Sequence, residues 1–539
     1  MQSLGLICAA GIRVLVSRVQ LGGLFAQVLR VSLIRVIGLL LAFCAGFLLL
    51  GLAAPRKPTI TTTVTPDMRT EAIQQALFDA PFGATIYFEP GQYSVTRGLD
   101  IPCKNLTITG PVATVPSVTL AATFQGRTIF SFPQGCPKLG AIRYIHFQNT
   151  GAVYVGANSA EFEFDHNLLT HLPSAVGGDY TVTETGVFLD GSLSPMTSTR
   201  HVTIHDNTFG DASSCTAVFA SGKDEGGYCA GIITHTGFIQ DLEILRNQFI
   251  HLEEGIHLLQ LAEWKPGDPS SGCLSCVIDY NSVVNYHRIG IEIQVHTRDT
   301  MLIRHNAVIE PLGAYYGTFA VSLACCQWSP IQGVPGYSPS LLFDDNVLIA
   351  TVPGYQCPPY GVEFWGQGAK GTNNLVEGLF CNGFTWGYGA GSWAINNNYI
   401  CGPNFASGGG YISNQQHQNN PPAQAGDVTE PACSARASVA PTIYPRDGAF
   451  EGTEVISLSD SGSNTNVWYT TDGSIPVPGS GTAQIYTRPL TIVKSTVVKA
   501  VGMWGAPNQP ISYPPRYGYV PSQVVTASFV AKARNVDSD

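Results

Sequence analysis

Apolar and polar positions follow a phrase that returns along the middle of the chain. The phrase runs apolar, any residue, apolar, two mixed residues, Asn, any residue, apolar. Clear copies occupy residues 162–169, 202–209, 245–249, 277–283, 302–308, 343–348 and 395–400, and a degenerate copy begins at Asn374. Each copy predicts a short strand, a bend at the Asn and a second strand, because apolar side chains at every second position are typical of strands.

The asparagines of these phrases are spaced like the units of a stacked repeat. They stand at positions 167, 207, 247, 281, 306, 346, 374 and 398, with gaps of 24 to 40 residues. Asn suits a bend because it tolerates a left-handed backbone and bonds to neighbouring main chain. One coil cannot bury its apolar residues, whereas a pile of coils shares one core. The pattern therefore predicts a solenoid whose Asn amides bond from coil to coil.

The repeated phrases resemble the right-handed parallel β-helix family of pectate-lyase-like proteins, over residues 67–401. The resemblance implies an all-β fold with functional residues on the outer surface of stacked coils. The mean gap of 33 residues predicts about ten coils. A short helix capped by Asp67, with Ile73, Ala76 and Leu77 on one face, is expected to cover the N-terminal end of the stack.

The C-terminal part changes character twice. Residues 402–440 are rich in Gln, Asn, Gly and Pro and predict a linker. Residues 441–530 contain short alternating strands and predict a small β-sandwich, followed by a tail at 531–539. The phrases at 469–474, 486–490 and 498–501 resemble the Ig-like chitobiase/β-hexosaminidase C-terminal domain. That resemblance implies a non-catalytic accessory module of the kind appended to exported glycan-active proteins.

The N-terminal 54 residues predict export. Four arginines precede an uncharged apolar run at 36–54, and no Asp or Glu occurs before residue 67. Such a run can span a bilayer, and the basic residues before it favour an N-terminus inside. Small residues before position 54 favour cleavage as a signal sequence, and a retained membrane anchor is the alternative. Either way the rest of the chain is extracytoplasmic, after a Thr- and Pro-rich spacer at 55–66.

Cysteines and charge narrow the class of protein. Twelve of the 14 cysteines lie outside the leader, an even number that indicates disulfides in an exported chain. Cys215 with Cys229 would close one loop, and Cys273 with Cys276 predicts a tight bridge rather than half of a zinc site. The net charge of −10, without a basic block, argues against nucleic acid as a binding partner. We expect a monomer without cofactor or metal; calcium is conceivable in this fold, but no acidic loop has its ligand spacing.

The strands that follow the Asn phrases carry the candidate chemistry. Segments 255–258, 290–294 and 361–364 align, and alternation sends His257, Glu292 and Glu363 outward. Equal positions on adjacent coils lie about 4.8 Å apart. His257 and Glu292 are therefore predicted neighbours, while Glu292 and Glu363 would be two coils, about 9.6 Å, apart. Side chains leaning together would approach the separation of an inverting glycosidase pair, about 6.5–9.5 Å.

Further residues are predicted to complete a polysaccharide site. His257, Glu292 and Glu363 with Arg288 as charge stabiliser form the catalytic hypothesis. Predicted substrate-binding residues are His235, His287, Lys265, His296 and Trp365. An Arg or Lys would neutralise a uronate carboxylate, and a His or Lys would remove a proton in a lyase or epimerase. The simpler interpretation is a solvated polar face, and Glu253 and Glu254 are assigned to a bend.

Two functions follow from the sequence. The first is an exported carbohydrate-active enzyme, a lyase, hydrolase or epimerase that acts on a polysaccharide. The second is a non-catalytic surface protein that binds glycan or acts as an adhesin, and contacts the membrane only through its N-terminal segment. Polygalacturonase-like members of the resembled family carry Asn-Thr-Asp, Gly-His-Gly and Arg-Ile-Lys phrases, and this sequence has none of them.

Overall fold

The fold is described from a computed structural model. It describes residues 60–113, 115–176, 185–191, 198–216, 227–235, 237–258, 272–294, 301–311, 319–323, 341–350, 360–364, 370–386, 394–396, 398–403, 411–413, 428–430, 436–437, 441–446, 448–459, 465–474, 476, 482–504, 519–520, 522 and 524–532. The predicted leader lies outside these residues. Within them, no helix combines the length and apolarity needed to cross a membrane.

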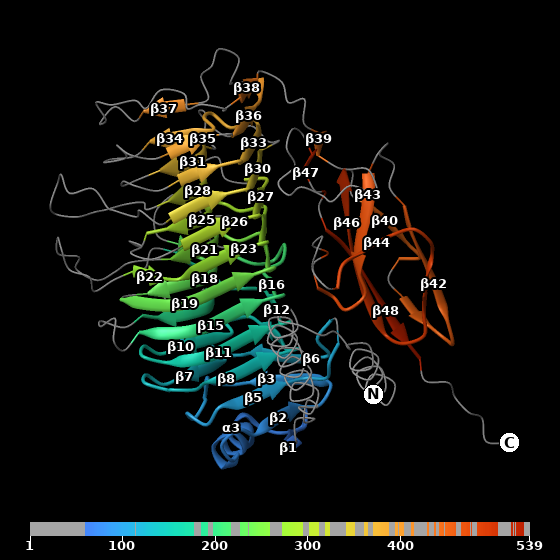
Figure 1. Cartoon of the computed structure of the whole chain (residues 1–539). Coiled ribbons are helices and arrows are strands. Elements are labelled where there is room, and N and C mark those ends of the chain that lie inside the picture. Colours follow the sequence, from blue (N-terminus) through green and yellow to red (C-terminus); the bar gives the residue numbers. More distant parts are fainter. Residues whose placement is uncertain are drawn as a thin grey trace, which may run out of the picture. The chain divides into compact units, whose positions relative to one another are not determined.

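Three long parallel sheets run along the stack of coils (Figure 1). Sheet 1 contains β1 (Ile60–Val64), β2 (Thr85–Phe88), β5 (Leu106–Thr109), β8 (Gly140–Arg143), β11 (Ala160–Asp165), β15 (Thr199–His205), β19 (Phe238–Leu245), β23 (Cys276–Asp279), β26 (Met301–Arg304), β29 (Leu341–Asp344), β32 (Lys370–Thr372) and β35 (Ala394–Asn396), with β22 (Gly272–Leu274) beside β19. Sheet 2 contains β3 (Gly91–Val95), β6 (Val118–Ala122), β9 (His146–Gln148), β12 (Leu168–Thr170), β16 (Thr208–Phe209), β20 (Gln248–Ile250), β24 (Ser282–Val284), β27 (Ala307–Ile309), β30 (Val347–Ala350), β33 (Leu375–Gly378), β36 (Tyr399–Cys401) and β38 (Val428–Glu430). Sheet 3 contains β4 (Leu99–Asp100), β7 (Phe130–Phe132), β10 (Val153–Val155), β14 (Thr185–Asp190), β18 (Ala230–His235), β21 (Glu254–Leu258), β25 (Ile289–Ile293), β28 (Phe319–Leu323), β31 (Tyr360–Phe364), β34 (Phe384–Trp386) and β37 (Tyr411–Ser413).

The chain visits sheets 1, 2 and 3 in that order, which confirms the predicted parallel β-helix. Within the described residues it completes eleven turns from β2 to β37, where the spacing predicted about ten. The stack also passes both ends of the predicted range. Strand β1 lies in the predicted spacer, and β37 and β38 lie in the predicted linker. The composition of these segments did not predict the strands. Backbone groups form the hydrogen bonds to a neighbouring coil, so a strand can pair there without apolar side chains.

The asparagines form the predicted ladder, along the bend between sheets 1 and 2. At each step one Oδ1 accepts from the backbone nitrogen and the side-chain amide of the Asn one coil earlier. Asn247 Oδ1 lies 3.1 Å from Asn207 N and 2.9 Å from Asn207 Nδ2. Asn247 Nδ2 also donates to the carbonyl of Ile204 at 2.8 Å. The eight ladder residues are 0–3% exposed, so these bonds satisfy polar groups that water does not reach.

The left-handed residue of this bend precedes the ladder Asn, which corrects the prediction. Positive φ values of 52° to 61° occur at His166, Asp206, Arg246, Tyr280, His305, Asp345 and Asn373. This residue turns the chain between the two sheets, and the amide that follows then points into the stack. Asn is therefore required for its hydrogen bonds to neighbouring coils rather than for its backbone tolerance.

A helix at the N-terminal end carries the predicted apolar face. Helix α3 (Thr70–Asp79) buries Ile73 and Leu77 in the core that the coils share, and contacts β1 and β4. It begins later than predicted, with Arg69 at the N-cap. Asp67 instead accepts a hydrogen bond from the Thr65 hydroxyl at 2.5 Å, and so does not cap the helix.

Glycines line the start of the strands in sheet 3, where inner side chains of sheet 2 approach the backbone. A Cβ placed on Gly231 would lie 2.3 Å from a ring carbon of Phe249 and 2.6 Å from the carbonyl oxygen of Gly255. A Cβ on Gly290 would lie 2.3 Å from a methyl group of Val308. Glycine is therefore required at both positions, because a Cβ atom cannot approach other atoms this closely.

The Gly231→Ala substitution is expected to lower the free energy of unfolding by about 2 kcal/mol, because overpacking displaces Phe249 or the strand. Denaturant unfolding followed by circular dichroism measures this change. The matched control is Ala320→Gly, in the same row one coil beyond Gly290, with an expected loss of at most about 1 kcal/mol. Equal stability of Gly231→Ala and the unmodified protein would contradict the close approach.

The C-terminal domain is a small β-sandwich, as the sequence predicted. One sheet contains β40 (Thr442–Tyr444), β42 (Glu454–Ser459) and β45 (Leu490–Ile492), and the other contains β41 (Gly448–Phe450), β48 (Val525–Ala531), β46 (Thr496–Trp504), β43 (Thr465–Thr470) and β44 (Gln484–Ile485). Ile456, Val498 and Phe529 belong to its separate apolar core. Short strand pairs are formed by β13 (Ala175–Val176) with β17 (Gly227–Tyr228), and by β39 (Arg436–Ala437) with β47 (Tyr519–Val520).

Disulfides connect the cysteines that the sequence paired. Cys215 is bonded to Cys229 and Cys273 to Cys276, and a further bridge joins Cys103 to Cys136. Cys381 and Cys401 are disulfide-bonded as well. Such bonds persist in oxidising compartments, so they indicate an extracytoplasmic protein.

Candidate functional site

The outer face of sheet 3 carries a row of polar residues that parallel register stacks on consecutive strands. His257 of β21 pairs with Glu292 of β25, Glu292 with Ser322 of β28, and Ser322 with Glu363 of β31. Their neighbours Ile256 and Ile291 belong to the shared core, as alternation predicted. The row is therefore outward-facing, with His257 and Glu292 adjacent and Glu363 two rungs beyond Glu292.

His257 lies between two carboxylates. Its Nδ1 is 2.5 Å from Glu254 Oε2, and its Nε2 is 3.5 Å from Glu292 Oε2. Arg288 Nη1 lies 3.2 Å from the other oxygen of Glu254. Gln294 Nε2 donates to Glu292 Oε1 at 2.5 Å. We call Glu254, His257, Arg288 and Glu292 the Glu254 cluster.

The Glu254 cluster is buried, so its residues do not form the solvated polar face of the simpler interpretation. The side chains of His257 and Glu292 are 0% exposed and that of Glu254 is 1% exposed, whereas Arg288 keeps 32% of its side chain exposed. Sequence alternation reports which way a side chain leaves its own coil. It does not report what covers that face.

Burial and neighbouring charge shift the pKa values of the two carboxyl groups of the cluster in opposite directions. Burial alone would raise the pKa of Glu254, but His257 and Arg288 hold it below its ordinary value. Burial raises the pKa of Glu292, and the negative charge of Glu254 adds to this rise. Burial would lower the pKa of His257, yet Glu254 and Glu292 raise it. The arrangement favours an ionised Glu254, a protonated His257 and a protonated Glu292.

Glu253 adds a second protonated carboxyl group beside the cluster. Burial, followed by the negative charge of Glu254, raises its pKa to about 8. Its Oε2 accepts a hydrogen bond from the backbone nitrogen of Cys229 at 3.2 Å. Glu253 therefore carries a proton at neutral pH and adds little negative charge to the site.

Sequence reasoning missed Glu254 and assigned it to a bend. Residues three apart on a regular strand face opposite sides, so alternation separates Glu254 from His257. The strand departs from alternation at Gly255: a Cβ there would lie 2.9 Å from Val283 of the shared core, and the next residue, Ile256, also belongs to that core. A Cβ on Gly255 would lie 2.7 Å from the carbonyl oxygen of Gly290. The sequence did contain a signal for this contact: a glycine stands directly after two glutamates and shortly before an outward-facing histidine.

The remaining predicted residues lie in different surroundings. Glu363 accepts a hydrogen bond from the Ser322 hydroxyl at 2.9 Å and is 8% exposed. His287 precedes β25, and burial followed by the nearby His251 lowers its pKa to about 4, so it is uncharged at neutral pH. His235 interacts with Asp190, at 3.0 Å, in a separate cluster. The predictions for Lys265, His296 and Trp365 fall outside the described residues.

Among the described residues, two clusters present the donor types that a metal ion binds. One ligand atom from each of Glu254, His257 and Glu292 lies within 4.8 Å of the others. Carboxylate oxygens with imidazole nitrogen suit a divalent transition metal. Glu163, Asp165 and His205 form the second group, but Arg143 pairs with both of its carboxylates. In the Glu254 cluster, Arg288 and the protonated His257 already supply positive charge.

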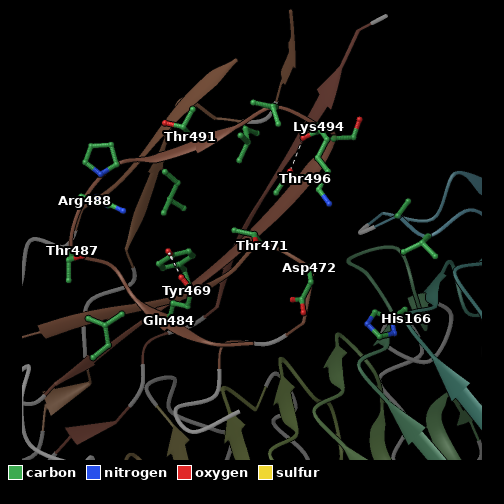
Figure 2. Close-up of a pocket in the computed structure, with 18 of the residues that line it drawn as sticks. His166, Tyr469, Thr471, Asp472, Gln484, Thr487, Arg488, Thr491, Lys494 and Thr496 are labelled. Carbon is green, nitrogen blue, oxygen red and sulfur yellow. Dashed lines mark hydrogen bonds between the residues drawn. The ribbon is translucent and has the colours of Figure 1, made fainter. Parts of the chain in front are cut away.

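The C-terminal domain shows a different use of polar residues. Tyr469 donates a hydrogen bond to Gln484 at 2.9 Å, which joins β43 to β44 (Figure 2). Asp472 accepts from the Ser474 backbone nitrogen at 3.0 Å, which fixes the predicted turn at Gly473. These contacts hold strands and turns together. Among the described residues of this domain, no group of three acidic, histidine or cysteine side chains converges as in the Glu254 cluster.

The fold defines a parallel β-helix protein with a small C-terminal β-sandwich domain. Residues 445–512 match the family model of the chitobiase/beta-hexosaminidase C-terminal domain. The chain is similar to the surface protein and adhesin PfbA of Streptococcus pneumoniae, with 13% identity over 69% of this chain and 99% of that chain, and a TM-score of 0.40. It is also similar to the alginate lyase of Paenibacillus sp. str. FPU-7, with 13% identity over 63% and 99% of the two chains and a TM-score of 0.37.

A third similar structure is the catalytic domain of a GH87 alpha-1,3-glucanase in complex with tetrasaccharides. It has 12% identity over 70% of this chain and 66% of that chain, and a TM-score of 0.48. No curated protein sequence matches the chain. Structural neighbours thus include carbohydrate-active β-helix proteins and an adhesin.

Proposed function

We propose that the protein is an exported carbohydrate-active enzyme that hydrolyses glycosidic bonds at the Glu254 cluster. The observation that supports this is the opposite displacement of two pKa values within one cluster, lowered for Glu254 and raised for Glu292. The negative charge of Glu254 contributes to the raised pKa of Glu292, and a carboxyl group with a raised pKa is the usual form of a catalytic acid. A cluster of charges is also costly to bury, so it is expected to have a function.

Glu292 is the proton donor in this proposal. Its raised pKa favours the protonated carboxyl group, and protonation of a leaving glycosidic oxygen requires such a group. Glu363 is the base that activates water, because two rungs of about 4.8 Å place it near the upper end of the inverting range, about 6.5–9.5 Å. Arg288 and His257 hold Glu254 ionised, and Gln294 orients Glu292 through the bond to Oε1.

The protonation of His257 favours hydrolysis over elimination or epimerisation. A lyase or epimerase needs a base that removes a proton from carbon. Glu254 and Glu292 raise the pKa of His257, which favours its protonated form, and a protonated imidazole cannot accept a proton.

Access to the cluster is limited. Since His257 and Glu292 have no exposed surface, a saccharide can reach them only after the side chains that cover them move. Arg288, with 32% of its side chain exposed, is the cluster member that an arriving chain would contact first. Export through the apolar segment at 36–54, cleaved or retained, would bring the protein to its substrate.

The test is to incubate the full-length protein with a panel of polysaccharides and to analyse the products. We expect new reducing ends from a neutral glycan such as xylan or an α-1,3-glucan, without the absorbance of unsaturated products. Glu292→Gln should lower turnover at least about 100-fold, because the amide cannot donate the proton. Glu243→Gln, on the exposed face of sheet 1, is the matched control and should retain activity. Unsaturated products, or an active Glu292→Gln variant, would contradict the proposal.

The burial of the cluster favours a second candidate, a surface protein that binds glycan without turnover. In that case His257 and Glu292 stabilise sheet 3, and binding uses more exposed residues. Retained binding with no turnover of any polysaccharide in the panel would support this function over hydrolysis.

A further inference from the structure

A second polar cluster lies on sheet 3, on rungs adjacent to the Glu254 cluster. Tyr154 belongs to β10, Asp190 ends β14, and His235 ends β18. The Tyr154 hydroxyl donates to Asp190 Oδ2, and His235 Nδ1 lies 3.0 Å from Asp190 Oδ1. One carboxylate on the middle rung thus joins a phenol and an imidazole from the rungs on either side. We call these three residues the Tyr154 cluster.

Apolar side chains hold the rings of this cluster in place. The Phe188 ring lies 5.9 Å from that of Tyr154 and 5.4 Å from that of His235, between ring centroids. Phe188 and Ile233 are 4% and 0% exposed and form a small apolar group outside the coil. Packing on both sides therefore fixes the orientation of the hydrogen-bonding groups before any ligand arrives.

Solvent reaches the Tyr154 cluster, unlike the core of the Glu254 cluster. The side chains of His235 and Asp190 are 28% and 20% exposed, whereas His257 is 0% exposed. The two clusters share one face, because Ile233 pairs with His257 and His235 stands two residues further along the same strand. A polymer that reaches the Glu254 cluster along this face would pass Asp190 and His235.

We propose that the Tyr154 cluster is a subsite that binds hydroxyl groups of a neutral polysaccharide. This inference deepens the proposed function and rests on it for the identity of the ligand as a saccharide. A carboxylate offers about four lone-pair positions. Tyr154 and His235 use two of those of Asp190, which leaves acceptors for neighbouring sugar hydroxyls.

Charge decides between a neutral glycan and a polyuronate. The described side chains along this part of sheet 3 include the carboxyl groups of Asp190, Glu254 and Glu363. Arg288 is the one arginine or lysine among β14, β18, β21, β25, β28 and β31 and their described flanks. Arg288 is already paired with Glu254. A uronate carboxylate beside Asp190 would meet a like charge without a free cation, whereas hydroxyl groups donate to it favourably.

The test measures binding in the Glu292→Gln background, so that turnover does not interfere. Titration calorimetry with xylan or α-1,3-glucan oligosaccharides is compared with titration by oligogalacturonate. We expect binding of a neutral oligosaccharide and at least about tenfold weaker binding of the uronate. Asp190→Asn should weaken neutral binding about tenfold, since a hydrogen bond to a charged group is lost. Tyr154→Phe, which keeps the ring but frees Asp190, should weaken it about threefold.

The matched control is another His–Asp pair on the coils. His201 Nδ1 lies 3.1 Å from Asp241 Oδ2 on sheet 1, away from the proposed subsite. Asp241→Asn should leave affinity unchanged, and thermal unfolding of each variant checks that the fold persists. Equal losses for Asp190→Asn and Asp241→Asn would overturn the inference. Tighter binding of the uronate, or no binding of any neutral oligosaccharide, would overturn it too.

The outcomes separate this inference from the proposed function. If the unmodified protein hydrolyses a polysaccharide of the panel but substitutions of Asp190 and Tyr154 do not change affinity, the enzymatic function stands and the subsite is rejected. Binding that depends on Asp190, without any turnover, would retain the subsite and reject the enzyme.

Discussion

Asn247→Ala is expected to lower the free energy of unfolding by about 4 kcal/mol, because it removes a rung from the middle of the ladder. Asn247 Oδ1 is the acceptor for the backbone nitrogen of Asn207, and its Nδ2 donates to the carbonyl of Ile204. Both backbone groups would lose these partners in an interior that is 0% exposed at Asn247. Each such loss costs about 1–3 kcal/mol, and the ladder bond to Asn281 is lost as well.

Guanidinium unfolding followed by far-ultraviolet circular dichroism measures this effect. Asn285→Gly is the matched control, because Asn285 is a positive-φ residue at a bend and lies outside the ladder. Glycine accepts that conformation, so a change of at most about 0.5 kcal/mol is expected. A small and equal change in both variants would show that the ladder amides do not stabilise the stack.

The ladder and the core could be predicted because their chemistry repeats. The Asn phrase recurs on each clear coil, so eight positions report the same geometry and errors at one copy do not matter. The pairing of His257 with Glu292 followed from the same alignment. Strands β1 and β38 lacked the phrase and were therefore assigned to a spacer and a linker, although their backbones pair with the stack.

The candidate site could be predicted only in part, because it depends on departures from the repeat. Glu254 reaches His257 because Gly255 and Ile256 both face the core, a departure from alternation that no periodic rule contains. The burial of Glu292 depends on what covers sheet 3, and an alignment of coils carries no information about it. Tyr154 and Asp190 lie on coils that the alignment of outward residues did not include, so their contact with His235 was not foreseen.

Glu254→Gln is expected to lower the free energy of unfolding by about 3 kcal/mol near pH 6, because it leaves buried positive charge without its main partner. Glu254 is the largest favourable influence on the protonated form of His257, and it also pairs with Arg288. The amide still fits the space but carries no charge. His257 would then lose the cause of its raised pKa and become neutral at lower pH.

The pH dependence of this loss follows from the directions of the two pKa shifts. Glu254 has a lowered pKa, so its contribution is present above its ordinary value of 4.5 and disappears as the pH falls through the folded value. His257 has a raised pKa, so its contribution is complete below 6.5 and disappears as the pH rises through the folded value. The difference between the unmodified protein and Glu254→Gln should therefore be largest between pH 4.5 and 6.5.

Unfolding midpoints measured over a series of pH values test this profile. Glu161→Gln is the control, because Glu161 forms a solvent-screened, exposed ion pair with Lys138 and should change the midpoint little at any pH. A constant difference across the series would contradict an ionic contact between Glu254 and His257. A maximum in the slightly acidic range would establish that the protonated His257 is held by Glu254, which is the protonation state that the hydrolytic proposal requires of the resting site.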